Sequence, residues 1–146
     1  MRTLIIILVV ELFSVIASAQ TLEQVKHFRA AAINHNVPVN KLIKIAYVES
    51  HFKANAVRYN KNGTMDVGLM QINSIHWDTT CKEYDVTTVK GNINCGAKIL
   101  AGHKGKMAID KCWYARYHSK TLKFKERYCD KLANVPTKVL IKLADK

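Results

Sequence analysis

Apolar residues recur every three or four positions over most of the chain, the pattern of helices that bury one face. A first helix is expected from a capping-box pattern at Thr21 as far as the turn residues at 35–38. A second, capped by Asn40, carries on one face Leu42, Ile45, Ala46 and Glu49. Further helices are expected over 92–104, 108–117 and 121–132, with a short one after Pro136. The pattern predicts a mainly α protein.

The stretch from 53 to 75 departs from helical spacing. Residues 53–66 are polar and contain turn formers, which predicts a loop or a short irregular hairpin. Residues 67–75 are apolar but interrupted by Gly68 and Gln71, which fits neither a regular helix nor a regular strand. A chain of 146 residues suits one hydrophobic core. We therefore expect a single small helical domain with one β-like segment.

Residues 1–19 have the pattern of a signal peptide. Arg2 precedes an apolar run, and Ala17-Ser18-Ala19 supplies the small residues of a cleavage site before Gln20. The alternative is a retained membrane anchor, but Glu11 interrupts the run before the roughly 20 residues that span a bilayer. The expected mature domain is 20–146, exported to the periplasm with no stable membrane anchor.

The four cysteines all lie in this expected mature domain. An even number in a small exported domain predicts two disulfides, and the absence of a close pair makes a zinc site a poor fit. A short turn at 118–120 would join two helices as an antiparallel hairpin and bring Cys112 opposite Cys129. Cys81 then pairs with Cys95 by elimination.

The chain carries 23 Lys and Arg against 11 Asp and Glu, a net charge of +12. This charge predicts attraction to anionic surfaces, which for an exported protein are wall polymers and head groups and not nucleic acid. Phosphate-binding, dinucleotide-binding and zinc-hydrolase motifs are absent from the sequence, so no cofactor or metal is expected. Scattered lysines on a solvated surface remain the alternative.

Glu49 is the first candidate for chemistry, because its helical face is the one expected to be buried. A carboxyl in an apolar cleft has a raised pKa and can act as a general acid. The alternative is a partly exposed glutamate at a helix end that makes a salt bridge.

Two further segments carry polar groups suited to a sugar. Residues 66–74 place Gln71 and Asn73 between apolar neighbours, where amides suit neutral hydroxyl and acetamido groups, although a buried turn is an equal alternative. Residues 113–118 gather three aromatic residues that could face sugar rings or pack in the core. His118 follows them and is expected in a surface turn.

Taken in order, three segments resemble the soluble lytic transglycosylases with a goose-lysozyme-like catalytic domain. They are Ile45-Ala46-Tyr47-Val48-Glu49-Ser50, Gly68-Leu69-Met70-Gln71-Ile72-Asn73 and the Ala-x-Tyr segment at 115–117. The resemblance covers roughly 22–132 and is greatest to small exported members that accompany secretion or conjugation machines. It implies an α+β lysozyme-like fold with a catalytic cleft.

The resemblance also implies an activity and a site. The family cleaves the β-1,4 bond between N-acetylmuramic acid and N-acetylglucosamine in peptidoglycan and leaves a 1,6-anhydro end. Glu49 would be the single catalytic acid and base, and Tyr117 would orient it. The implied substrate-binding residues are Ser50, Gly68, Leu69, Met70, Gln71, Asn73, Tyr117 and His118. The family's usual Tyr-Asn pair is replaced here by Tyr117-His118.

Two other functions stay open at this point. The next acid after Glu49 is Asp66, 17 positions on, so ring closure with one carboxyl is expected, whereas a hydrolytic muramidase would use Asp66 to position water. The other alternative is a non-catalytic protein that binds the wall as an assembly factor. The expected partners are glycan strands and components of a secretion or conjugation machine, with the protein acting as a monomer.

Overall fold

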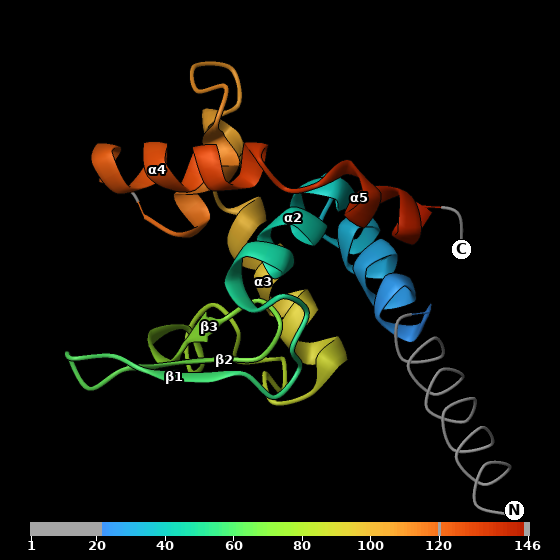
Figure 1. Ribbon diagram of the computed structural model, residues 1–146. Coiled ribbons are helices and arrows are strands. Elements are labelled where there is room, and N and C mark those ends of the chain that lie inside the picture. The colour runs from blue at the N-terminus through green and yellow to red at the C-terminus, as the bar shows by residue number, and fades with distance from the viewer. Residues whose placement is uncertain (1–21, 120, 145–146) are drawn as a thin grey trace, which may run out of the picture.

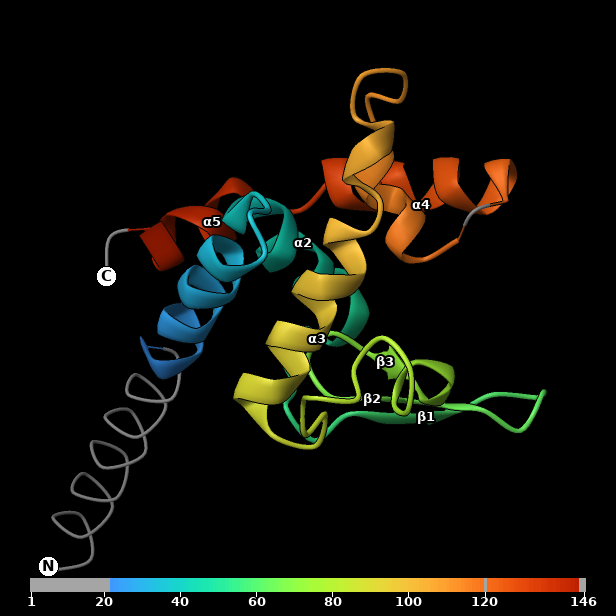
Figure 2. The same ribbon diagram turned by 180° about the vertical axis from the view of Figure 1, so that it is seen from behind.

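The computed structural model describes residues 22–119 and 121–144, and Figures 1 and 2 show their arrangement. Its longer helices are a first helix over 22–34, α2 (Val39–Ser50), α3 (Val89–Ala101), α4 (Leu122–Ala133) and α5 (Thr137–Ala144). Its strands are β1 (Val57–Tyr59), β2 (Met65–Val67) and β3 (Ile72–Asn73). Short 3-10 helices cover Ser74–His76, Lys104–Lys106 and Trp113–Tyr117. The signal-peptide segment 1–19 and the cap at Thr21 lie outside the described residues.

The mainly α fold expected from the pattern is confirmed. α3 runs through the middle of the molecule, with the sheet near its first residues and α4 crossing near its last (Figures 1 and 2). Fully buried side chains from each part of the chain meet around it: Phe28, Leu42, Ile45, Leu69, Met70, Ile93, Leu100 and Leu132. No helix within the described ranges is long and apolar enough to cross a membrane.

The segment from 53 to 75 is an antiparallel sheet in the order β1-β2-β3. β1 pairs with β2 so that Arg58 stands opposite Asp66, and β2 pairs with β3 so that Asp66 stands opposite Asn73. Gly63 takes a φ of 81° in the hairpin turn, where a residue with a side chain would be strained. Each strand has only two or three residues, which explains why alternation was not visible in the sequence.

Two expectations for the helices are wrong. α2 is capped by Pro38, whose extended backbone (ψ 122°) leads into the helix, and Asn40 lies inside its first turn. The expected helix over 108–117 is a run of turns followed by the 3-10 helix Trp113–Tyr117. There the Asp110 carboxylate accepts the backbone N–H of Cys112 at 3.0 Å, a local bond that competes with helical hydrogen bonding.

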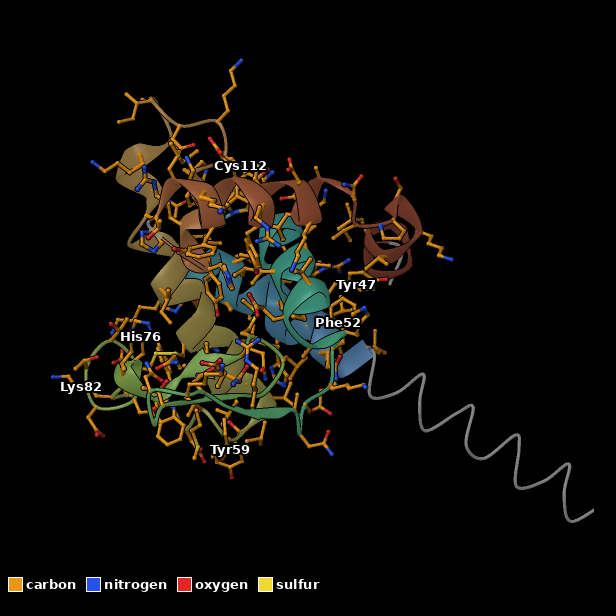
Figure 3. The ribbon with its side chains drawn as sticks, turned by 60° about the vertical axis from the view of Figure 1, so that its left-hand side comes forward. Tyr47, Phe52, Tyr59, His76, Lys82 and Cys112 are labelled. Atoms are coloured by element: carbon orange, nitrogen blue, oxygen red, sulfur yellow. A yellow bond between two sulfur atoms is a disulfide. The ribbon has the colours of Figure 1, made fainter. Side chains whose placement is uncertain are left out.

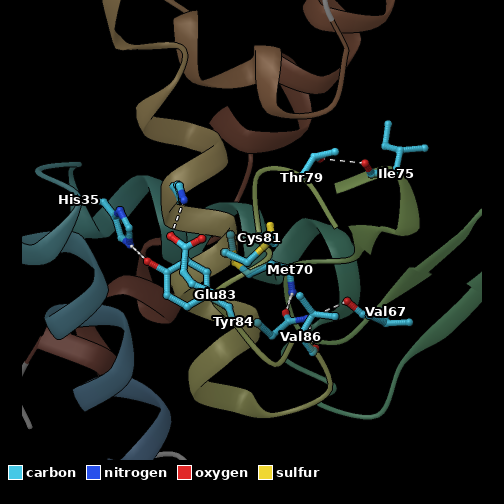
Figure 4. The surroundings of a disulfide bond; sticks show 12 residues. His35, Val67, Met70, Ile75, Thr79, Cys81, Glu83, Tyr84 and Val86 are labelled. Carbon is cyan, nitrogen blue, oxygen red and sulfur yellow. Dashed lines mark hydrogen bonds and ion pairs between the residues drawn. A yellow bond between two sulfur atoms is a disulfide. The ribbon is translucent and has the colours of Figure 1, made fainter. Parts of the chain in front are cut away.

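Both expected disulfides are present, Cys81–Cys95 and Cys112–Cys129. The first ties the turns after the sheet to α3, and Figure 4 shows its surroundings. The second ties the start of the Trp113–Tyr117 helix to α4. α4 also packs against α2.

Candidate active site

Glu49 lies in the last turn of α2, and its side chain is turned inward. The next two residues, His51 and Phe52 after Ser50, take left-handed backbone angles (φ 54° and 64°) that end the helix abruptly. The Glu49 side chain is only 8% exposed. Of the two positions left open by the sequence, a buried face and a partly exposed helix end, the structure has the side chain buried in the last turn of the helix.

A cavity of about 490 Å³ opens beside this carboxyl. The sheet and the turn after it form most of its lining, and the end of the Trp113–Tyr117 helix completes it. The lining residues are Glu49, Arg58, Asn60, Lys61, Asn62, Thr64, Asp66, Gln71, Ile72, Asn73, Ile75, His76, Ile99, Tyr117 and His118. Figure 3 shows Tyr59, which is absent from this lining, on the outer side of the sheet.

Tyr128 of α4 donates a hydrogen bond from its hydroxyl to Glu49 Oε1 at 2.6 Å. Burial raises the pKa of Glu49, while the Tyr128 bond and the charge of Arg58 lower it by less. The balance leaves the Glu49 pKa above its ordinary value, so the protonated acid persists to higher pH. Because Oε1 accepts from Tyr128, Oε2 is the oxygen left to carry a transferable proton.

His118 covers the other side of Tyr128. The two rings stack with centroids 4.6 Å apart and planes 6° apart, and His118 Nδ1 lies 3.8 Å from Glu49 Oε1. Burial and the nearby charges of Lys131 and Arg58 lower the pKa of His118. The neutral imidazole is therefore favoured beside the protonated acid. The pKa of Tyr128 is raised by burial and by Glu49, so Tyr128 stays a donor throughout.

A second carboxyl lines the same cavity, that of Asp66 on β2. Its residue is 4% exposed, and it forms an ion pair with Arg58 at 2.6 Å. Asn60 donates to Oδ2 at 3.1 Å and Asn73 donates to Oδ1 at 2.7 Å. Both oxygens of Asp66 are thus engaged by donors from the sheet and its turn. Sequence reasoning set Asp66 apart because it is 17 residues from Glu49, but the hairpin folds it back to the cavity.

The turn between β2 and β3 is held by Asn92 of α3. Asn92 accepts from the Met70 backbone N–H at 2.8 Å and donates to the carbonyls of Val67 and Val86, each at 2.9 Å (Figure 4). Gly68 has a φ of 74°, and a Cβ there would overlap the Asn92 side chain. Gly68 and Asn92 together fix the backbone that presents Gln71 to the cavity.

The residues implied by the resemblance fall into two groups. Gln71, Asn73, Tyr117 and His118 line the cavity with Glu49. The other group is placed behind it: Ser50 Oγ donates to the Leu69 carbonyl at 2.8 Å, Gly68 shapes the turn, and Leu69 and Met70 are fully buried. These four support the wall of the cavity from the core.

The tyrosine that contacts Glu49 differs from the one expected. Tyr117 donates its hydroxyl to the Met70 carbonyl at 2.7 Å, so it braces the turn, and Tyr128 makes the bond to Glu49. The signal for Tyr128 was present in the sequence, where it shares a helical face with Phe124 and Leu132. A tyrosine on a buried face requires a partner for its hydroxyl.

The charged and polar groups lining the cavity include two carboxyls, several amides, the cations of Arg58 and Lys61, and the imidazoles of His76 and His118. In the part of the chain that the structure describes, no group of three or more His, Cys, Asp or Glu side chains is placed to hold a metal ion. A buried carboxyl with a raised pKa that shares a cavity with a second carboxyl is an arrangement suited to cleaving a glycosidic bond.

The chain belongs to the family described as the transglycosylase SLT domain, whose model matches residues 26–124. It is similar to lysozyme-like protein 6 of Bos taurus, with 33% identity over 73 residues, 42% of this chain and 49% of that protein. It is also similar to protein IpgF of Shigella flexneri, with 46% identity over 46 residues, 32% of this chain and 30% of that protein.

The matches cover about half of the length of lysozyme-like protein 6 and less than a third of IpgF. The family supports a lytic transglycosylase-like function, in the general class of enzymes that cleave glycosidic bonds. The family and the disulfides together point to an exported protein.

Proposed function

We propose that the protein is a peptidoglycan lytic transglycosylase that cleaves the bond between N-acetylmuramic acid and N-acetylglucosamine. The observation that carries the proposal is the buried Glu49 carboxyl, which Tyr128 fixes at the wall of a polar cavity. The raised Glu49 pKa makes it a general acid for the leaving glycosidic oxygen.

The reaction follows from the two oxygens of Glu49. Oε2 gives its proton to the glycosidic oxygen, and the bond from that oxygen to C1 of the muramic sugar breaks. The resulting carboxylate, still held by Tyr128, accepts the proton of the C6 hydroxyl as that oxygen bonds to C1. The proton taken up equals the proton given, so Glu49 is restored and no water is consumed.

Asp66 supplies charge to this reaction. Positive charge develops at C1 as the bond breaks, and a carboxylate lining the cavity stabilises it electrostatically. Asp66 accepts four hydrogen bonds, from Arg58 Nε, Arg58 Nη2, Asn60 and Asn73. With both oxygens so engaged, the side chain is held in one orientation at the wall of the cavity.

The presence of Asp66 in the cavity also favours a second candidate, a hydrolytic muramidase. In that reaction Asp66 would position a water molecule or bond to C1, and the product would have a free reducing end. The two candidates are distinguished by digesting sacculi in water labelled with oxygen-18 and measuring the masses of the products by mass spectrometry. Transglycosylase products end in an unlabelled anhydro sugar, whereas hydrolysis places one labelled oxygen at each new end.

The Asp66→Asn variant adds a measurement to the same assay. Asparagine keeps the size of the side chain and removes its charge, so cleavage should slow by about 10²-fold or more while the anhydro product is retained. Labelled reducing ends in the wild type would overturn the transglycosylase and leave the muramidase. Sacculus binding with no product of either kind would instead indicate a non-catalytic assembly factor.

The biological setting is part of the proposal. We infer that cleavage opens the periplasmic wall locally for a secretion or conjugation apparatus, as the resemblance to small exported transglycosylases implies. In the source organism, replacing the gene with a Glu49→Gln copy should reduce secretion or conjugation without reducing the amount of the protein. Unchanged transfer with the inactive copy would refute this role.

A further inference from the structure

The segment between α3 and the Trp113–Tyr117 helix, residues 104–111, stands out from the body of the molecule (Figures 1 and 2). We refer to it as the 104–111 loop. Every residue from Gly105 to Ile109 is exposed. Met107 is 48% exposed and Ile109 is 80% exposed. Two large apolar side chains therefore face solvent at the tip of a projecting loop.

The charges around this tip have one sign. Lys104, Lys106 and Lys111 lie in the loop, and Asp110 is its single acidic residue. The Asp110 carboxylate binds Lys125 at 2.9 Å and Arg116 at 3.1 Å, both from the body of the protein. Its charge is neutralised at the base of the loop, which leaves the outer part cationic.

The base of the loop is firmly attached. The Cys112–Cys129 disulfide follows the loop directly and joins it to α4. Within the loop, the backbone N–H groups of Met107 and Asp110 donate to the carbonyls of Lys104 and Lys106, each at 2.9 Å. Because the turns are already formed, the apolar tip is displayed with little further loss of backbone entropy on binding.

We propose that the 104–111 loop docks the protein on an anionic lipid bilayer, with Ile109 and Met107 inserted among the head groups and the lysines above them. The choice of a lipid bilayer as the partner follows from charge and composition. Each lysine near an anionic bilayer increases the binding affinity about five-fold, and its aliphatic side chain can extend so that the ammonium stays in water. Protein interfaces, by contrast, are depleted in lysine and centred on aromatic residues or arginine, which the loop lacks.

The position of the loop is compatible with catalysis at the membrane surface. It leaves the last residues of α3, while the sheet that forms most of the cavity lining lies near the first residues of that helix (Figures 1 and 2). A bilayer that contacts the loop tip therefore leaves the cavity accessible to a glycan strand. Docking of this kind is reversible and salt-sensitive, since it relies on one small loop.

The test is co-sedimentation of the exported protein with vesicles, after mass spectrometry has established where the purified chain begins. One set of vesicles contains phosphatidylglycerol and phosphatidylcholine in equal parts, and the other contains phosphatidylcholine alone. We expect binding to the first set only, weakening as salt is raised. Met107→Ser with Ile109→Ser should reduce this binding by about ten-fold without a change in charge.

Ile33→Ser is the matched control, because Ile33 is 79% exposed on the first helix and also loses an apolar side chain. It should bind as the wild type does, and both variants should melt at the wild-type temperature. The proposal is overturned if the wild type does not bind anionic vesicles, or if the loop variant binds them as tightly as Ile33→Ser does. Analytical sedimentation without vesicles tests the other partner, a second copy of the chain. If the wild type is a dimer, the loop variant is a monomer and neither binds vesicles, the loop forms a contact between copies and the membrane proposal is overturned.

Discussion

Tyr128→Phe tests the proposed role of the Glu49 contact, because it deletes one hydroxyl and keeps the ring that stacks on His118. The lost bond is the 2.6 Å donation to Glu49 Oε1, which lowers the Glu49 pKa. Its removal must therefore raise that pKa further. A hydrogen bond to a charged group contributes about 1.5–3 kcal/mol, so its loss should raise the Glu49 pKa by a readily measurable amount.

The assay is the pH dependence of kcat/KM on a soluble glycan fragment. Activity requires protonated Glu49, so it falls as the pH rises through the Glu49 pKa. In Tyr128→Phe this basic limb should move to higher pH, and the plateau should fall because Glu49 is then a weaker acid. Thermal unfolding of the same samples checks that the fold is retained.

Two tyrosine variants serve as comparisons. Tyr84→Phe loses a hydroxyl that contacts His35 Nε2 at 3.2 Å, away from the cavity, and should leave the profile unchanged. Tyr117→Phe releases the Met70 carbonyl and should lower the rate without moving the limb as Tyr128→Phe does. A limb that moves in Tyr117→Phe and stays in Tyr128→Phe would refute the reasoning and restore the role expected from the sequence.

Three further outcomes are expected. Glu49→Gln should abolish cleavage. It should also raise the melting temperature at neutral pH, because a buried acid with a raised pKa destabilises the folded state once it is ionised. Thermal unfolding at a series of pH values should show this gain disappearing below pH 4.5, the ordinary pKa of a glutamate. Gly68→Ala should cost about 2–4 kcal/mol in urea unfolding, and Gly63→Ala only about 1 kcal/mol, since both have positive φ but only the first lacks room for a Cβ. Removing the Cys112–Cys129 bond with serine at both positions should cost about 3 kcal/mol for its separation of 17 residues, and a smaller loss by calorimetry would contradict that value.

The parts of the structure that the sequence predicted are those set by local periodicity. Glu49 shares a face with Leu42 and Ile45 at helical spacing, which made it a candidate for burial, although the spacing alone did not exclude a partly exposed position at the helix end. The Cys112–Cys129 pairing was also predicted, although one arm of the expected helical hairpin is a 3-10 helix. The pairing depends on the chain reversing between the two cysteines and not on the kind of helix in each arm.

The choice of tyrosine shows where local reasoning failed. Tyr117 lies in the motif that resembles the family, but it is at the end of a 3-10 helix that begins after the Asp110 turn. The direction of a side chain there depends on where the short helix starts, which the sequence did not indicate. Tyr128 lies in the regular helix α4, whose crossing over α2 is a tertiary contact. The motif therefore did not indicate which tyrosine contacts Glu49.

Asp66 shows the corresponding limit for mechanism. Its separation from Glu49 along the chain made a one-carboxyl reaction the natural expectation, yet the cross-strand pairs with Arg58 and Asn73 bring its charge to the same cavity. The number of carboxyls in a site is a property of strand pairing, and the role of each depends on its donors. Burial raises the pKa of Glu49 and outweighs the opposing effect of its Tyr128 donor, whereas Asp66 is held at the cavity wall by a guanidinium and two amides. A cavity that contains both Glu49 and Asp66 is compatible with either proposed reaction, ring closure by the C6 hydroxyl or attack by water. In the proposed reaction the product at C1 depends on whether the C6 hydroxyl or a water molecule attacks that carbon, which the labelled-water experiment measures directly.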